Sequence, residues 1–190
     1  MIPIPAKYLN LSEAAFFEFC REMSPYRIER DEEGKIYIQE PAGTYTGGFN
    51  AEVTTEISIW NRENNQGKVF DSSTGYTLPD GSVRSPDSSW IAKARWDNVA
   101  QEDRVRFAHI SPDFVIEIKS YSDRLPELQR KMERYIHNGV RLAWLLDPEQ
   151  QQAWIYRQDG SVEHRNSFDE PLYGEDVLRG FELRLAEMKD

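Results

Sequence analysis

The segment 112–119 constrains the fold more than any other part of this chain. It reads Pro-Asp-Phe-Val-Ile-Glu-Ile-Lys, and its side chains alternate as they do in a β-strand. One face of such a strand is purely apolar. The other carries Glu117 and Lys119, roughly 6–7 Å apart along the strand. A strand this apolar is expected at the centre of a sheet, where buried charges need partners or a metal.

The periodicities around this strand predict an α/β (α+β) fold, a mixed β-sheet flanked by helices. A strand–helix–strand unit over 113–146 should be parallel with a right-handed crossover, and the pair within 68–92 should be antiparallel. Ser122 or Asp123 is expected to cap the helix of the crossover, and Gly139 to end it. The remaining predicted elements are a helix at 12–23 capped by Ser12, a hairpin of 26–30 and 35–39, a helix at 49–63 after Gly47 and Gly48, strands at 142–146 and 153–157, a short helix near 100–107, and a weak strand at 181–185.

A second Pro-Asp pair, Pro86-Asp87, lies within a strand-like stretch at 83–92. Proline cannot donate a hydrogen bond to the ladder, so we expect a bulge, a bend or a sheet edge at this point. Such irregularities often redirect a side chain. Asp87 is therefore a candidate to join Glu117 and Lys119 in one site.

Length and composition set limits on the kind of protein. The 190 residues suit a single domain over 1–190, with a helix and hairpin appendage at 1–44 and a core at 45–190. The chain has no apolar run long enough for a membrane span and no secretion signal at its start, so a cytoplasmic location is expected. Cys20 is the only cysteine, which excludes an internal disulfide, and the three histidines show no ligand spacing.

The net charge of −10 weighs against a broad nucleic-acid surface, because contacts with phosphates need local positive charge. The basic residues are nevertheless concentrated in the middle third of the chain, around the candidate strands. A local basic lip around a site is compatible with this distribution.

These residues are suited to metal-dependent hydrolysis of a phosphodiester. Mg²⁺ prefers oxygen ligands and keeps several of its waters, so Asp87, Glu117 and the backbone carbonyl of Ile118 suffice to hold magnesium or manganese. Lys119 would orient or deprotonate the attacking water, or stabilise the developing charge. In the alternative interpretation, Glu117 and Lys119 form an ion pair at an edge strand, worth less than about 1 kcal/mol. Asp87 and Asp113 would then cap turns after proline.

Ser85-Pro86-Asp87 together with Glu117-Ile118-Lys119 resembles the PD-(D/E)XK nuclease superfamily. The ordered motifs over residues 45–185 resemble, more narrowly, the Uma-two (Uma2) family of restriction endonucleases. These motifs include Lys131-x-x-x-Tyr135 and the segment Trp-Leu-Leu-Asp-Pro at 144–148. The resemblance implies a restriction-endonuclease-like fold and a divalent-metal site, with Asp87 and Glu117 as metal ligands and Lys119 as the catalytic lysine. Many members of the family lack this lysine.

The same resemblance suggests auxiliary residues. Lys131 and Tyr135 share one helix face and could both look toward the strand, or Lys131 is a solvated helix lysine. Glu52 or Asn50 could lend a ligand from the first core helix, or Glu52 is a surface residue. Asp113 could support the site or simply open its strand.

Three functions remain open on the sequence. The first is a Mg²⁺-dependent endonuclease that acts on DNA, as a homodimer if it cuts both strands. The second is a catalytically silent interaction domain that keeps the nuclease fold, since a fold does not determine a function. The third is a phosphatase or ribonuclease that uses the same metal.

Overall fold

The structure, a computed structural model, describes residues 2–5, 9–39 and 41–188. The chain divides into two compact units. The first unit consists of residues 1–41, 73–85 and 98–111, and the second of residues 42–72, 86–97 and 112–190. The N-terminal helix and hairpin thus share a unit with two later segments. The single domain over 1–190 with an appendage at 1–44 stays a prediction.

The first unit is built on a six-stranded sheet in the order β1-β3-β2-β6-β5-β8. Ser12 caps α1 by accepting a hydrogen bond from the Ala15 N–H, and the predicted hairpin is present as β2 and β3. Phe16 of α1 and Ile28 of β2 are buried together in its core. The elements of this unit are β1 (Ile2–Ile4), α1 (Glu13–Glu22), β2 (Arg27–Arg30), β3 (Ile36–Gln39), β5 (Tyr76–Thr77), β6 (Val83–Arg84), α4 (Gln101–Arg104) and β8 (Ala108–His109).

The second unit is built on another six-stranded sheet, in the order β12-β11-β10-β9-β7-β4, and carries a separate pair of strands, β13 and β14. Its elements are α2 (Thr44–Asn64), β4 (Gly67–Asp71), β7 (Ser88–Ala92), α3 (Lys93–Asp97), β9 (Phe114–Ile118), α5 (Leu125–His137), β10 (Leu142–Asp147), β11 (Gln152–Arg157), β12 (Val162–Arg165), β13 (Leu172–Tyr173), β14 (Glu182–Leu183) and the 3₁₀ helix η2 (Leu185–Met188).

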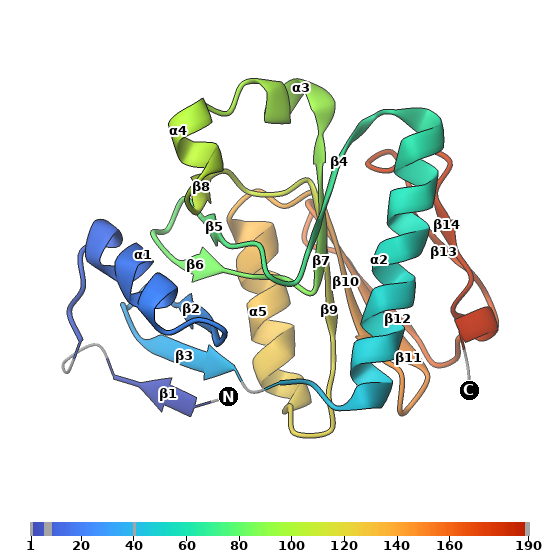
Figure 1. Cartoon of the computed structure of the whole chain (residues 1–190). Coiled ribbons are helices and arrows are strands. Elements are labelled where there is room, and N and C mark those ends of the chain that lie inside the picture. The colour runs from blue at the N-terminus through green and yellow to red at the C-terminus, as the bar shows by residue number, and fades with distance from the viewer. Residues whose placement is uncertain (1, 6–8, 40, 189–190) are drawn as a thin grey trace. The chain divides into compact units, whose positions relative to one another are not determined.

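Strand β9 is the central strand that the sequence predicts. All five of its residues are buried. It runs parallel to β10 on one side and antiparallel to β7 on the other, as expected from the crossover. Figure 1 shows β9 among the neighbouring strands of this sheet, with α5 leading from it to β10. The mixed sheet and its flanking helices confirm the predicted fold class.

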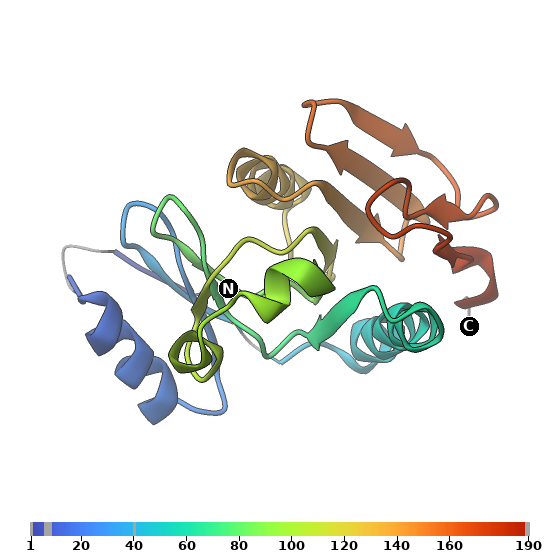
Figure 2. The same ribbon diagram turned by 90° about the horizontal axis from the view of Figure 1, so that it is seen from above.

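Helices α2 and α5 cover opposite faces of this sheet (Figure 2). The apolar face of β9, with Phe114 and Ile116, packs in one core with Phe49 and Val53 of α2. Glu117 points to the other face, where it contacts α5. The period of two along β9 therefore separates an apolar interface with α2 from a polar contact with α5.

The structure corrects three predictions of local structure. Helix α2 begins at Thr44 rather than after Gly48, because the row of buried apolar residues further along the helix offsets the roughly 1 kcal/mol that a glycine costs inside a helix. The stretch 83–92 is two strands, β6 and β7, which belong to different sheets and are separated by residues 85–87. Residue Arg124 occupies the N-cap of α5 without a side-chain hydrogen bond. The carboxylate of Asp123 accepts hydrogen bonds from Ser120 instead.

Candidate functional site

Asp87 directly precedes β7 and lies next to the last residue of β9. The ladder between β7 and β9 stops where Ser88 pairs with Ile116. Beyond it, Asp87 Oδ2 accepts a hydrogen bond of 2.8 Å from the Ile118 N–H, so the carboxylate replaces the missing strand partner. Continued by one step, the same register sets Asp87 across from Glu117, and residues directly opposite one another have Cβ atoms about 4.5–5.5 Å apart.

Glu117 lies in a polar cluster between β9 and α5. Its side chain is 4% exposed, and its Oε1 accepts a hydrogen bond of 2.8 Å from the Tyr135 hydroxyl and pairs with Lys131 Nζ at 2.8 Å. Lys131 and Tyr135 are one helical turn apart and lie on the buried face of α5. The ammonium compensates the buried carboxylate, which alone would be costly to keep away from water. The structure thus makes Lys131, and not Lys119, the lysine that contacts Glu117.

Lys119 has a different partner, Asp147, at the end of β10. Lys119 Nζ lies 3.2 Å from Asp147 Oδ2, and the lysine side chain is 14% exposed. The parallel register pairs Ile118 with Leu146, so the next residues, Lys119 and Asp147, come side by side on one face. Asp147 Oδ1 also accepts the Gln150 N–H at 3.1 Å, which fixes the carboxylate. Lys119 is therefore held at the sheet and does not extend into bulk solvent.

Asp147 is a residue of this cluster that the sequence reasoning did not select. The signal in the sequence was an aspartate directly after a buried apolar strand that follows the crossover helix. Using that signal requires the register between β9 and β10, because a slip of one residue would point Asp147 to the opposite face.

The donor set at the end of β9 is suited to a hard divalent cation. Asp87 and Glu117 supply carboxylate oxygens, and the Ile118 carbonyl leaves the strand on the same edge as the N–H that Asp87 binds. Within the described residues, no group of three or more His, Cys, Asp or Glu side chains could hold a metal. A cation here would have two carboxylates and would keep several waters, which is the habit of Mg²⁺.

The other predicted ligands lie apart from this cluster. Glu52 is exposed on α2, and Asn50 accepts a hydrogen bond of 3.3 Å from Thr54 of the same helix. Helix α2 packs on the apolar face of β9, whereas the Glu117 side chain points to the face of α5. A role for Glu52 or Asn50 at a metal stays a prediction.

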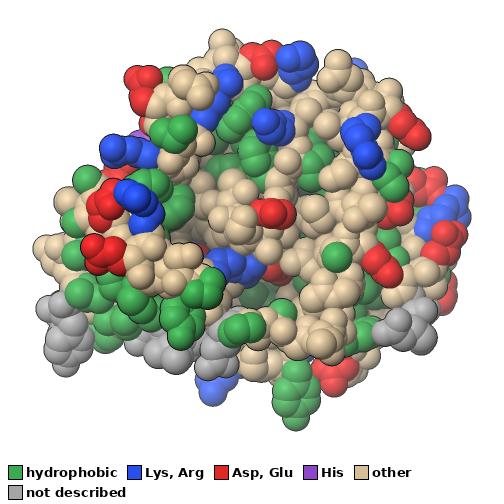
Figure 3. All heavy atoms as spheres, in the orientation of Figure 1, with side chains coloured by type: hydrophobic (Ala, Val, Ile, Leu, Met, Phe, Trp, Pro, Cys, Tyr) green, Lys and Arg blue, Asp and Glu red, His purple; other side chains and the backbone are tan. Residues whose placement is uncertain are grey.

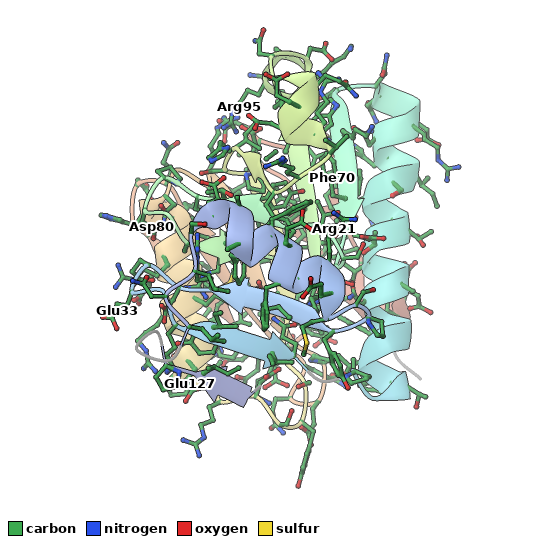
Figure 4. The ribbon with its side chains drawn as sticks, turned by 60° about the vertical axis from the view of Figure 1, so that its left-hand side comes forward. Arg21, Glu33, Phe70, Asp80, Arg95 and Glu127 are labelled. Carbon is green, nitrogen blue, oxygen red and sulfur yellow. The ribbon has the colours of Figure 1, made fainter. Side chains whose placement is uncertain are left out.

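Asp113 lies at the opposite end of β9, four residues before Glu117 and roughly 13 Å from it along the strand. Its Oδ2 accepts the Ala92 N–H at 2.8 Å and pairs with Arg95 at 2.9 Å. Arg95 belongs to α3, the short helix that follows β7 (Figure 4). Asp113 thus ties the start of β9 to the end of β7.

Cysteine and histidine contribute no further site among the described residues. Burial raises the pKa of the Cys20 thiol to about 12, against a smaller opposite effect of Arg30. His109 pairs with Glu13 at 2.9 Å, and the ring of His164 stacks on Trp154.

Charges of both signs are mixed on one face of the protein. On the face shown in Figure 3, lysine and arginine side chains are interspersed with aspartate and glutamate, and the described residues form no broad basic surface there. A search of the described helices finds none long and apolar enough to cross a membrane.

The chain is similar to one family of known proteins and to two solved structures. The model of the Uma2 family, described as "Putative restriction endonuclease", matches residues 14–186. A crystal structure of a "putative nuclease belonging to DUF820" from Anabaena variabilis ATCC 29413 is similar in fold, with a TM-score of 0.76 and 18% sequence identity over 94% of this chain and 97% of that one. A cryo-EM structure of a DrdV–DNA complex is more distant, with a TM-score of 0.41 and 14% identity over 61% of this chain and 10% of that one.

No curated protein matches the chain. The family model, in contrast, spans nearly its whole length, including every residue of the cluster around Glu117. The chain therefore belongs to the Uma2 family of restriction-endonuclease-like proteins.

Proposed function

We propose that this protein is a divalent-metal-dependent nuclease that hydrolyses phosphodiester bonds of DNA. Asp87, Glu117 and the carbonyl of Ile118 would hold Mg²⁺ or Mn²⁺. The observation that carries the proposal is the hydrogen bond from the Ile118 N–H to Asp87. It sets a second carboxylate beside Glu117, at the point where β9 loses its pairing with β7.

The bound cation would activate water and offset charge on the phosphate. Lys119, 3.2 Å from Asp147, is a charged hydrogen-bond donor, so its fitting role is to neutralise the negative charge that develops on the phosphate. This role suits the ion pair better than the role of a general base, because an ammonium group has no lone pair with which to accept a proton. Lys131 and Tyr135 hold the Glu117 carboxylate in one orientation.

The pair of Glu117 and Lys131 also favours a second candidate function. A glutamate that is already compensated by a buried ammonium can serve stability alone. In that case the chain is a catalytically silent binding domain with a nuclease fold, which its net charge of −10 also suits.

Cleavage assays separate the two functions. Supercoiled plasmid and single-stranded DNA are incubated with the protein in Mg²⁺, in Mn²⁺ and in EDTA, beside Asp87→Asn, Glu117→Gln and Lys119→Met. The matched control is Glu133→Gln, an exposed glutamate on α5. We expect metal-dependent cutting by the wild type and the control, and a loss of at least about a hundredfold in the three site variants.

Equal cutting by Glu117→Gln, or cutting in EDTA, would refute the proposed site. Absence of cutting by the wild type, together with no thermal shift in millimolar Mn²⁺, would favour the silent binding domain.

An enzyme that cuts both strands of a duplex is further expected to act as a homodimer. Light scattering in the presence of duplex DNA tests this, and a mass of one chain under cutting conditions contradicts it.

A further inference from the structure

The connection from β9 to α5 starts directly at the candidate site. The Lys119 N–H still donates to the Leu146 carbonyl at 2.7 Å, so the backbone of Lys119 belongs to the sheet edge. The chain then turns at Ser120 and enters α5 at Leu125. This connection lies at one end of the sheet of the second unit, below β9 in Figure 1.

Hydrogen bonds within the turn hold its shape. The Asp123 carboxylate accepts the Ser120 N–H at 2.9 Å and the Ser120 hydroxyl at 2.6 Å. The Asp123 N–H donates in return to the Ser120 carbonyl at 3.1 Å. The two serine hydroxyls, of Ser120 and Ser122, lie 3.3 Å apart. The turn is thus fixed at both ends, and Tyr121 stands at its tip.

Tyr121 is far more exposed than any other large hydrophobic side chain of the described chain. It is 90% exposed, whereas Val105 follows at 68% and Tyr173 at 54%. A tyrosine held on a fixed turn loses little conformational entropy when it binds a flat ligand, because only two side-chain torsions remain to be ordered.

Arg124 follows Tyr121 in the connection between β9 and α5 and adds a positive charge. The side chain of Arg124 is 81% exposed, and its nearest acid, Glu127 in the first turn of α5 (Figure 4), is 3.9 Å away. An exposed aromatic ring and an exposed guanidinium on one turn suit a nucleotide, with the ring against the base and the cation near a phosphate.

We propose that Tyr121 stacks on a nucleobase of the nucleic acid whose phosphate lies at Glu117 and Lys119. Two residues of chain span at most about 7 Å, so a ring at Tyr121 serves a nucleotide next to the reacting phosphate. The base must be unstacked, since the faces of paired bases inside a duplex are covered. The preferred substrate is therefore a single strand or a frayed or gapped end. This inference rests on the proposed nuclease function.

Binding measurements test the stacking without cleavage. Fluorescence anisotropy is recorded in Ca²⁺ with three labelled probes: an oligothymidylate, a strand of abasic residues of the same length, and a blunt duplex. The variants are Tyr121→Ala and Tyr121→Phe, and the control is Tyr173→Ala, which removes another exposed tyrosine of the second unit. Because both positions are exposed, all variants should fold, which circular dichroism verifies.

The wild type should bind the oligothymidylate more tightly than the abasic strand, and Tyr121→Ala should weaken oligothymidylate binding roughly 5- to 150-fold. It should leave abasic binding unchanged, because that probe has phosphates but no bases. Tyr121→Phe and Tyr173→Ala should bind as the wild type does.

Equal affinity of the wild type and Tyr121→Ala for the oligothymidylate overturns the stacking role, and so does an equal loss for the abasic strand. Either result leaves metal-dependent cleavage by the wild type untouched, so the proposed function survives it. A wild-type protein that neither binds nor cuts any probe removes the proposed function and this inference together.

Discussion

Replacement of Lys131 by methionine removes the ammonium that pairs with Glu117. The pair is 2.8 Å long, and the two side chains are 8% and 4% exposed. Breaking such a buried pair typically costs about 3–5 kcal/mol, because the remaining charge is buried without compensation. Tyr135 still donates to Glu117, so we expect the lower end, about 3 kcal/mol. For a chain of this length that corresponds to a fall in Tm of roughly 6–12 °C.

Urea unfolding followed by tryptophan fluorescence measures this loss. All five tryptophans lie in the second unit, so the signal reports on the unit that contains the pair. The double variant Glu117→Gln/Lys131→Met should recover most of the stability, since it removes both charges of the pair. Unchanged stability of Lys131→Met in EDTA, or no recovery in the double variant, would refute the reasoning.

The same variant also tests metal binding at Glu117. Without the ammonium, a divalent cation bound at Glu117 would supply the counter-charge that Lys131 supplied, so Mn²⁺ should stabilise Lys131→Met more than the wild type. Saturation at a hundred times the Kd is worth about 2.7 kcal/mol. The double variant lacks the carboxylate and should respond least. An equal shift in all three proteins would mean that the metal binds elsewhere.

Three further results are expected. Asp147→Asn should lower kcat about 10- to 100-fold in steady-state cleavage with KM little changed, because Lys119 loses its fixed partner; an unchanged kcat contradicts this. Asp113→Ala should lower the free energy of unfolding in urea by about 1–3 kcal/mol, because the Ala92 N–H loses its acceptor; cleavage per folded molecule should persist, and its loss would assign Asp113 to the site. Burial raises the pKa of the Cys20 thiol from 9.0 to about 12, so at pH 8 Cys20 should be a thiolate about a thousandfold less often than an ordinary thiol. Alkylation of the folded protein should be correspondingly slow and should become fast when urea is added. Rapid alkylation of the native protein would contradict the burial of Cys20.

The periodicity of the chain predicts the central part of the second unit correctly. The apolar alternation of 114–118 specifies a buried strand, and the helical spacing of Lys131 and Tyr135 puts both on one face of α5. The helix between β9 and β10 returns the chain to the end of the sheet where β9 began, and this makes the two strands parallel. The alternation along β9 and the spacing along α5 depend only on residues close together in the sequence, so the sequence alone predicts them.

The first residues and the caps of helices are harder to predict from the sequence, because competing local interactions have similar energies. Gly47 and Gly48 indicated the start of a helix that in fact begins before them. Asp123 is a good helix cap by type, yet it bonds back to Ser120. Each choice differs from its alternative by about 1 kcal/mol, which packing elsewhere easily overrides.

The pairing of charges is decided by tertiary structure. The sequence places Lys119 two residues from Glu117 and suggests that they act together. The structure instead joins Glu117 to Lys131 and Lys119 to Asp147, while Asp87 bonds to Ile118 of the neighbouring strand. These partners are distant in the chain, and only the register of β7, β9 and β10 brings them together. Register follows from the burial of whole sheet faces, a collective property that no short segment of sequence contains.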